Sequence, residues 1–350
     1  MTVGLDPEWI AEHSAIDGRR PRRAEFAGFV GTGQMSRNAR FALMWDDGEG
    51  PETVIVKLPS SEVNTRTLSF DHGAYLRECT FYRTIAPLVD ICMPQVLAVH
   101  YDAAAYDFAV VLEDLAGSEQ GDQFTEPSDE QLVLAIEQCA ALHAPLWNAT
   151  DTSTFDLYRE DADDRERKYA DTIPGLLDAV HERLGAGLDP AVPELIERFA
   201  RSAGRWARLT TASTTLVHGD FRPDNFMFAV DPGAPAIAVV DWQTVRLGIG
   251  VTDVAYLLGA AIRPEKRREI EHDMLQRYRS ELERRGVTDY PQAQCERDYA
   301  LGSLHGVVVA IRATTVADRT ERGDAMLTLM LNRHARHALD VGALDLIESS

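Results

Sequence analysis

The stretch His218-Gly219-Asp220-Phe221-Arg222-Pro223-Asp224-Asn225 carries the most information about this chain. It follows a short apolar run at 215–217 and places an aspartate and an asparagine five positions apart on a predicted loop. Such an aspartate can accept the proton of an attacking hydroxyl, and such an asparagine can bind a magnesium ion, as phosphoryl transfer requires. The alternative is a surface loop in which Asp220 and Asn225 only make turn hydrogen bonds.

A second carboxylate, Asp241, follows the apolar run Ile237-Ala238-Val239-Val240. The run predicts a short strand that ends at this acid. A carboxylate in that place can bind the Mg²⁺ that bridges the β- and γ-phosphates of a nucleotide. Because Asp241 comes after Asp220 and Asn225 in the order that this chemistry needs, a plain turn residue is the weaker interpretation.

Lys57 ends the β-branched run 53–56, where a long charged side chain is rarely buried unless it is paired. Its expected partner is Glu78, which shares the register of Phe81 and Ile85 on the next predicted helix. A lysine in this position can neutralise the α- and β-phosphates of a nucleotide. The alternative is an edge-strand lysine whose ammonium reaches water.

The turn Gly31-Thr32-Gly33-Gln34-Met35-Ser36 gives a weaker signal. Its two glycines lie between two predicted strands and would let backbone N–H groups approach a phosphate. Glycine hairpins are common, however, so this turn counts mainly through its position before Lys57.

Hydrophobic periodicity predicts an α+β chain with two lobes. The first 115 residues predict a largely antiparallel sheet with one inserted helix, which ends at Pro87; the strands are expected at 26–30, 39–45, 53–58, 96–100 and 107–112. Ser128 and Gln131 have the form of a capping box that opens a helix, and most of 150–215 and 262–345 is helical by pattern. We therefore predict an N-terminal lobe over 1–115, a hinge at 113–119 and a mostly helical C-terminal lobe over 120–350.

Composition narrows the function classes. With 35 Lys+Arg against 56 Asp+Glu the net charge is −21, which argues against broad contact with nucleic acid and is compatible with small cationic substrates or simple solubility. No apolar run approaches the ~20 residues of a membrane span, and no secretory leader is visible. The four cysteines form no C-x-x-C pair, so we expect reduced thiols and a cytoplasmic location. Oligomeric state stays open.

The ordered motifs resemble those of the aminoglycoside phosphotransferase-like kinases, which are small-molecule kinases with a protein-kinase fold. The matching positions are Gly31, Gly33, Lys57, Glu78, Glu113-Asp114-Leu115, His218-Gly219-Asp220, Asn225 and Asp241. The stretches V-V-L-E-D-L at 110–115 and H-G-D-F-R-P-D-N are most similar to the ecdysteroid-kinase-like and related bacterial branches. The resemblance covers roughly 25–260 and extends to choline and ethanolamine kinases.

The resemblance implies a bilobal, protein-kinase-like fold and a role for each matching residue. Asp220 would deprotonate the substrate hydroxyl, while Asn225 and Asp241 would hold Mg²⁺. Lys57, fixed by Glu78, would bind the α- and β-phosphates of ATP, with GTP as the alternative nucleotide.

The remaining roles are supporting ones. The glycine turn with Gly31 and Gly33 would approach the phosphates, and the backbone from Glu113 to Leu115 would hold the adenine. His218 would support the metal-binding aspartate, and Asp253 would steady the catalytic loop, unless it is only a helix N-terminal acid.

The resulting hypothesis is an enzyme that transfers the γ-phosphoryl group to a small-molecule hydroxyl, with no protein substrate because no A-P-E segment follows Asp241. The alternative is a nucleotide-binding regulator without turnover, which loss of a motif residue would have favoured. A hydrolase lacks support, because no G-x-S-x-G is present. The acceptor stays open between an aminoglycoside, a choline-like amino alcohol and a steroid-like alcohol. Candidates to line its pocket, each more often a core or surface residue, are Trp147, Tyr158, Trp242, His305 and Arg312.

Overall fold

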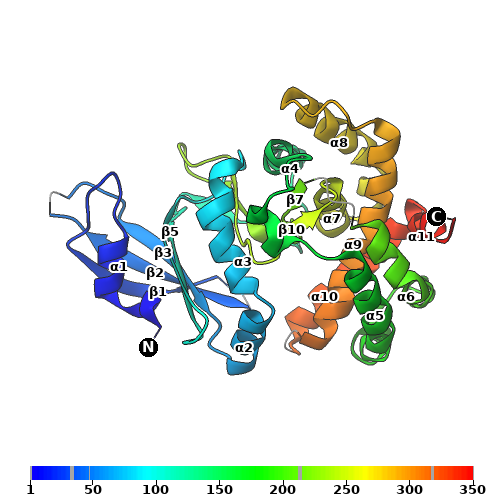
Figure 1. Ribbon diagram of the computed structural model, residues 1–350, viewed down its shortest axis with the longest axis horizontal. Helices are drawn as coiled ribbons and strands as arrows, with labels where there is room; N and C mark the ends of the chain where they lie inside the picture. The colour runs from blue at the N-terminus through cyan, green and yellow to red at the C-terminus, as the bar shows by residue number, and fades with distance from the viewer. Residues whose placement is uncertain (1, 32–34, 47, 212–214, 317–318, 350) are drawn as a thin grey trace. The chain divides into compact units, whose positions relative to one another are not determined.

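The computed structural model describes residues 2–31, 35–46, 48–211, 215–316 and 319–349 (Figure 1). The chain forms two compact units. The first unit comprises Met1–Leu88, Cys92–Glu119 and Ala229–Thr244, and the second comprises Val89–Ile91, Gln120–Phe228 and Val245–Ser350. Compactness alone does not delimit a folding domain, so the lobe boundaries drawn from the sequence stay a prediction.

An antiparallel sheet is the centre of the first unit. In the described residues its strands run in the order β1 (Arg23–Val30), β2 (Ser36–Met44), β3 (Thr53–Pro59), β5 (Asp107–Glu113) and β4 (Val96–Asp102). Every neighbouring pair is antiparallel. Each strand lies where the alternating and β-branched runs predict one, so the predicted N-terminal sheet is confirmed.

A short N-terminal segment covers one face of this sheet. It consists of a 3₁₀ turn at Val3–Leu5 and α1 at Pro7–His13, and Figure 1 shows α1 lying along the strands. Ile10 packs with Phe41, Val54 and other sheet residues in one buried cluster. Gly4 lies so close to the sheet that a Cβ atom on it would be 2.5 Å from Leu58 Cδ2 and 2.7 Å from Ala109 Cβ. Only glycine allows this close approach.

The helical segment between β3 and β4 differs from the prediction of one helix that ends at Pro87. It consists of α2 (Val63–Asp71), α3 (Ala74–Thr80), a π-helical turn (Phe81–Ile85) and a 3₁₀ turn (Ala86–Leu88). Gly73, with φ of 69°, separates α2 from α3 because its left-handed backbone cannot continue a helix. The predicted periodicity therefore identifies only α3 and its continuation.

The second unit is mostly helical, as predicted. Its helices are α4 (Asp129–His143), α5 (Ala162–Leu184), α6 (Val192–Leu209), α7 (Val251–Ala261), α8 (Pro264–Arg284), α9 (Gln292–Val316), α10 (Glu321–Asp340) and α11 (Ala343–Ser349). Ser128 and Gln131 make both hydrogen bonds of the predicted capping box. The short strands β7 (Thr215–Val217) and β10 (Arg246–Gly248) pair antiparallel within this unit. The remaining short strands are β6 (Ser118–Gln120), β8 (Phe226–Ala229) and β9 (Ile237–Val239).

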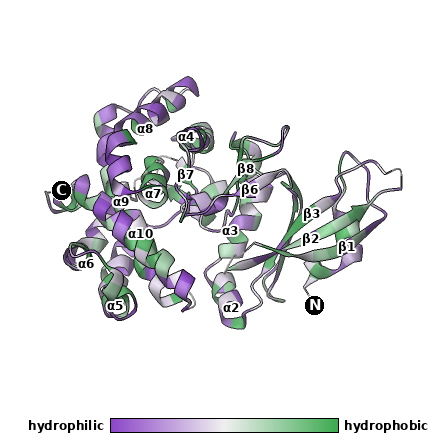
Figure 2. Cartoon of the chain, turned by 180° about the vertical axis from the view of Figure 1, so that it is seen from behind, coloured by the Kyte–Doolittle hydropathy of each residue, from purple (hydrophilic) through white to green (hydrophobic). Residues whose placement is uncertain are grey.

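Helix α7 lies in the interior of the second unit. All of its residues are buried, and Figure 2 shows it as mostly apolar, whereas α8 carries many hydrophilic residues. It packs against α9 and α10, and Figure 1 shows it among them. A helix that is hydrophobic on all sides belongs in a core. Side chains on α7 therefore have a rigid support.

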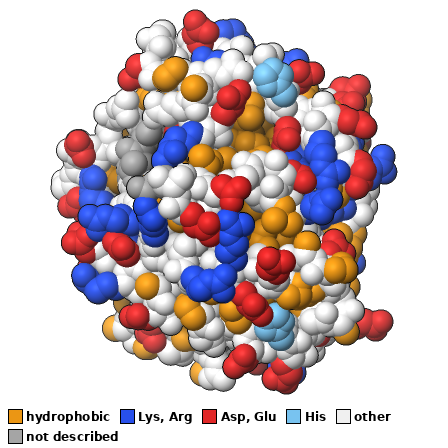
Figure 3. All heavy atoms as spheres, turned by 90° about the vertical axis from the view of Figure 1, so that its right-hand side faces the viewer, with side chains coloured by type: hydrophobic (Ala, Val, Ile, Leu, Met, Phe, Trp, Pro, Cys, Tyr) orange, Lys and Arg blue, Asp and Glu red, His pale blue; other side chains and the backbone are white. Residues whose placement is uncertain are grey.

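Helix α9 is long and apolar enough, by length and composition, to cross a membrane. However, 72% of its most apolar window is buried inside the structure, as in the core helix of a globular unit. On the face drawn in Figure 3, basic and acidic side chains are interspersed, so the net charge of −21 is not gathered there into one acidic patch.

Three buried histidines on α9 and α10 lie in the core of the second unit. His334 and His337 are fully buried, and no ring nitrogen of either has a hydrogen-bond partner. His305 is 8% exposed and also lacks a partner for Nδ1. Burial lowers the pKa of His305 and of His334 to about 3, and it lowers the pKa of His337 well below the ordinary value. The folded protein therefore holds all three rings neutral.

We expect the free energy of unfolding to fall steeply as the pH drops below about 6.5, the ordinary pKa of histidine. Below that pH the histidines bind protons in the unfolded chain, whereas the buried rings stay neutral in the folded one. The free energy of unfolding therefore falls by about 1.4 kcal/mol per pH unit for each ring. His334→Gln should therefore reduce the slope of stability against pH, measured by denaturant unfolding between pH 6.5 and 4, by about that amount. The exposed His272 provides the control, because His272→Gln should leave the slope unchanged. Equal slopes in both variants would contradict the expectation.

Candidate functional site

In the first unit, Lys57 lies between two carboxylates. Its Nζ is 2.7 Å from Glu78 Oε1 and 2.9 Å from Asp241 Oδ1. The alternation of β3 turns Val56 and Leu58 into the cluster under α1 and so places Lys57 on the other face of the sheet. Glu78 comes from α3, in the register that the sequence predicts, and is fully buried.

The two carboxylates keep Lys57 charged. Burial alone would lower the pKa of the ammonium, but the charges of Asp241 and Glu78 outweigh it, and the pKa is raised. Burial also raises the pKa of Glu78, against the attraction of Lys57. We take the Lys57–Glu78 pair as ionised, because two carboxylates act on one ammonium at hydrogen-bond distance. A buried lysine held by two acids is a preformed cation for binding phosphate.

The segment around Asp241 is fixed by its neighbours in the first unit. Asp241 has φ of 71°, which is rare for a residue other than glycine and marks a backbone held in place by its surroundings. Trp242 donates its backbone N–H to Glu78 Oε1 at 3.4 Å, and its ring stacks on Phe81 with centroids 4.0 Å apart. Trp242 is therefore a buried packing residue of the first unit.

The predicted hinge is anchored by side chains of the first unit. Asp114 accepts hydrogen bonds from Arg40 Nε at 2.6 Å and from Thr53 Oγ1 at 2.7 Å. Glu113 exchanges two bonds with Gln95: its N–H donates to the Gln95 carbonyl at 2.9 Å, and its carboxylate accepts the Gln95 N–H at 3.1 Å. Arg40 was not predicted as a partner of Asp114, because the two residues are 74 positions apart in the chain.

Of the predicted glycine turn, Gly31 has φ of 75°, a left-handed conformation that suits glycine. Gly33 lies outside the described residues. Beyond the turn, the Tyr75 hydroxyl donates to the Met35 carbonyl and accepts the Ser60 N–H at 3.0 Å. This tyrosine ties the start of β2 to the end of β3.

In the second unit, the loop after β7 is held through its backbone. Asp253, near the start of α7, accepts the N–H of His218 at 2.6 Å and the N–H of Gly219 at 3.0 Å. Gly219 has φ of 83°, so the loop needs glycine at this position. Asp253 thus fixes the backbone from which Asp220 projects.

Asp253 is itself kept charged in a fully buried place. Its carboxylate also lies 3.2 Å from His143 Nε2, and His143 Nδ1 is 2.9 Å from the Tyr278 hydroxyl. Burial opposes the negative charge, but the His143 hydrogen bond and the backbone donors outweigh it and lower the pKa of Asp253. The hydrogen-bonded series of Tyr278, His143 and Asp253 therefore holds the loop in place.

The Asp220 carboxylate is surrounded by donors. Tyr256 donates to Oδ1 at 2.8 Å, Asn225 Nδ2 donates to Oδ2 at 2.9 Å, and Arg222 Nε lies 3.1 Å from Oδ1 and 3.2 Å from Oδ2. Asn225 Nδ2 also donates to the Asp220 carbonyl at 2.7 Å. Two acceptors fix the amide of Asn225, so its carbonyl oxygen is the atom left to a cation.

The donor set suits magnesium, which prefers oxygen ligands and is usually held by one or two protein side chains together with substrate phosphates. The first unit supplies the carboxylate of Asp241, whose side chain is 40% exposed. The second unit supplies the amide oxygen of Asn225. Among the described residues no group of three or more His, Cys, Asp or Glu side chains could hold a metal ion alone. Each of these two oxygens, taken in its own unit, is therefore of the type that Mg²⁺ binds together with substrate phosphates.

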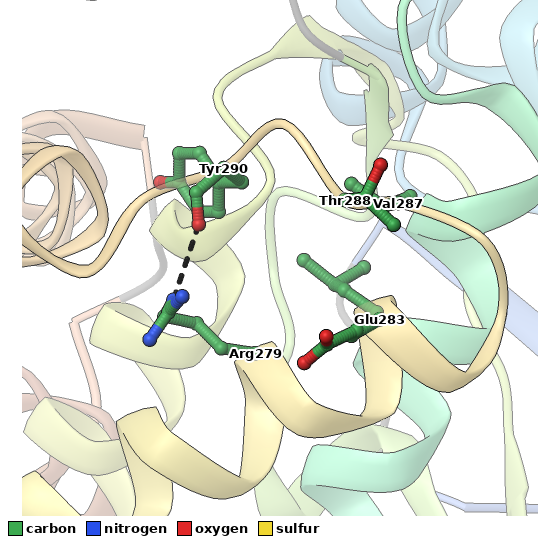
Figure 4. A pocket seen from close by; sticks show the side chains of 6 residues that line it. Arg279, Glu283, Val287, Thr288 and Tyr290 are labelled. Carbon is green, nitrogen blue, oxygen red and sulfur yellow. Dashed lines mark hydrogen bonds between the residues drawn. The ribbon is translucent and has the colours of Figure 1, made fainter.

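The residues expected near an acceptor have mostly structural positions. Tyr158 is buried, Trp147 stacks edge-on against Tyr290, and Arg312 is exposed. His305 is different, because its Nε2 lies 2.8 Å from the Gly219 carbonyl and so reaches the loop of Asp220. A separate small hollow is drawn in Figure 4, where Arg279 Nε donates to the Tyr290 carbonyl at 3.2 Å; no predicted site residue lines it.

The chain has the kinase-like fold of the small-molecule phosphotransferases. Within that class, the chain belongs to the ecdysteroid kinase-like family, which matches residues 35–286. This confirms the resemblance stated from the motifs.

Solved structures show the same fold at low sequence identity. A GDP and kanamycin complex of an aminoglycoside phosphotransferase matches with a TM-score of 0.53 and 17% identity, covering 93% of this chain and 96% of that one. Choline kinase from Cryptosporidium parvum matches with a TM-score of 0.52 and 11% identity, covering 99% and 94%. An aminopropanol kinase associated with a microcompartment matches with a TM-score of 0.50 and 14% identity, covering 96% and 98%.

One curated relative shares a short segment. Acyl-CoA dehydrogenase family member 10 from Mus musculus is 43% identical over 67 residues, which is 19% of this chain. The match spans 6% of the length of that protein.

Proposed function

We propose that this protein is a kinase that transfers the γ-phosphoryl group of ATP to a hydroxyl of a small molecule. The observation that carries the proposal is the buried Lys57–Glu78 ion pair at 2.7 Å. A charged pair in such a position contributes little to stability, because the cost of desolvation offsets the attraction. Kinases require the same pair in order to grip the nucleotide phosphates.

In this proposal each unit supplies its own part. Lys57 binds the α- and β-phosphates, Gly31 approaches them, and the backbone from Glu113 to Leu115 holds the base. Asp220 receives the proton of the acceptor hydroxyl, and His218 supports the metal site.

Asn225 and Asp241 would hold Mg²⁺, which when bound neutralises charge that develops on the transferred phosphoryl group. GTP is the alternative nucleotide, and complexes with ADP and with GDP occur among the structural neighbours. We place the protein in the cytoplasm, since the described cysteines are free thiols.

Three acceptor classes follow from the relatives: an aminoglycoside, a choline-like amino alcohol, and a steroid-like alcohol suggested by the family name. The immediate surroundings of Asp220 leave all three classes open. Arg222, beside Asp220, contacts Gln123 and the sulfur atoms of Met326 and Met330. The carboxylate of Asp224 also lies there, 3.9 Å from Arg222 Nη1, so a cationic acceptor would meet charges of both signs.

The proposal is tested first by nucleotide binding. We expect millimolar ATP with Mg²⁺ to raise the thermal midpoint by about 5 °C, because ligand at about 100 times its Kd adds about 2.7 kcal/mol to stability. ATP with EDTA should give a clearly smaller rise, and Asp241→Asn should remove most of the difference between the two. A shift independent of metal, or no shift at all, would contradict the assignment.

Transfer is then tested by ADP release in the presence of metabolite alcohols, sterols, amino alcohols and aminoglycosides. We expect one class to stimulate release well above the rate with water alone. Nucleotide binding without stimulated or basal release would instead identify a regulator that lacks turnover.

A further inference from the structure

The hydrogen bonds to Asp220 come from two different supports. Asn225 and Arg222 belong to the same loop as Asp220. Tyr256 comes from α7, and its hydroxyl lies 2.8 Å from Asp220 Oδ1. Among the described donors to the Asp220 carboxylate, Tyr256 is therefore the one that joins it to the helical core.

Tyr256 is held in one orientation. Its side chain is fully buried, and its ring stacks on His334 with centroids 5.0 Å apart and an angle of 13° between the planes. On another side its ring faces that of His305, with the two centroids 5.3 Å apart, and His305 Nε2 lies 2.8 Å from the Gly219 carbonyl oxygen. These contacts leave the hydroxyl little freedom except to point at Asp220.

The hydroxyl stays a donor. Burial raises the pKa of the Tyr256 phenol well above its ordinary value, and the charge of Asp220 raises it further. The χ2 torsion of an aspartate has a broad energy minimum, so hydrogen bonds from its own loop alone do not fix the orientation of the carboxylate. A fixed donor on a rigid helix removes that freedom and determines which lone pair of Asp220 remains for a substrate.

We propose that Tyr256 is a positioning residue, which orients Asp220 toward the acceptor through the hydrogen bond between the tyrosine hydroxyl and Oδ1. The inference rests on the proposed function. In the transfer step the acceptor oxygen bonds to the γ-phosphorus, and the bond from that phosphorus to the β,γ-bridging oxygen breaks. ADP leaves with the electron pair, and the acceptor proton passes to Asp220. Misplacing this carboxylate by about 1 Å is enough to cost about 100-fold in rate.

The test is Tyr256→Phe, which removes the hydroxyl and keeps the ring. The probe is Mg²⁺-ATP alone, with water as acceptor and ADP release as the readout, so no acceptor need be known. We expect kcat to fall 10- to 100-fold, while KM for ATP stays within about threefold. A merely structural tyrosine would alter the thermal midpoint and leave kcat per folded molecule unchanged.

The matched control is Tyr299→Phe. Tyr299 is also a buried tyrosine of the second unit, and its hydroxyl donates to the carboxylate of Glu271 at 3.3 Å. Unchanged kcat in Tyr256→Phe, or an equal fall in both variants, would overturn the inference. Absence of ADP release from the wild-type protein under every acceptor would instead refute the proposed function, so the two failures are distinguishable.

Discussion

Replacing Asp220 with alanine is expected to lower the rate of ADP release by about 10³-fold. The change removes the carboxylate that is proposed to receive the proton of the acceptor hydroxyl. A positioned acid–base group contributes about 10²- to 10⁴-fold to the rate. The affinity for Mg²⁺-ATP, measured by titration calorimetry, should stay within about threefold, because no nucleotide-binding role is assigned to this side chain.

Asp224→Ala is the control for that variant. Asp224 lies on the same loop, and its Oδ2 is 3.9 Å from Arg222 Nη1. It should retain activity within a few-fold. Equal ADP release by Asp220→Ala and the wild-type protein would show that Asp220 is not the base.

The second large effect is expected for Lys57→Arg, although the charge is kept. Nζ is a point donor that fits between Glu78 Oε1 and Asp241 Oδ1, whereas a guanidinium is planar and wider and pairs with carboxylates in a fork. In a buried place the larger group would disturb both ion pairs, so kcat/KM for ATP should fall by about 100-fold, or about 2.7 kcal/mol. Steady-state kinetics at saturating acceptor, or ADP release with water as acceptor, would measure it.

Lys266→Arg controls for the change of side chain. Lys266 is half-buried, and its Nζ lies 2.7 Å from Asp129 at the start of α4. It should keep normal activity. Normal kcat/KM in Lys57→Arg would mean that Lys57 does not act on the nucleotide phosphates.

The fold was largely predictable, because local sequence patterns indicated most of its strands and helices. The β-branched runs identified the strands of the first unit, and the capping box at Ser128 identified the start of α4. The exception was the segment between β3 and β4, where Gly73 divides one apolar pattern into two helices. A glycine in the left-handed region is a property of the backbone that hydrophobic periodicity does not record.

The candidate site was only partly predictable. The alternation of the strand and the register of the following helix predicted that Lys57 and Glu78 pair, and the structure places them in contact. Tyr256 was missed, although its position three residues after Asp253 on an apolar helix marked it as a lone hydroxyl in a core. The contact between Arg40 and Asp114 is a pairing across the sheet, for which the sequence contains no local signal.

The N-terminal segment and the last helices set the limits within which this chain can fold. The family match covers residues 35–286, but Ile10 and Ala24 complete the cluster on one face of the sheet, and α9 and α10 contribute much of the core of the second unit. A fragment cut at the homology boundaries would expose apolar surface in both units and would lose His334, on which Tyr256 stacks. The region that the family model matches is thus smaller than the region that must be expressed to obtain a well-packed protein.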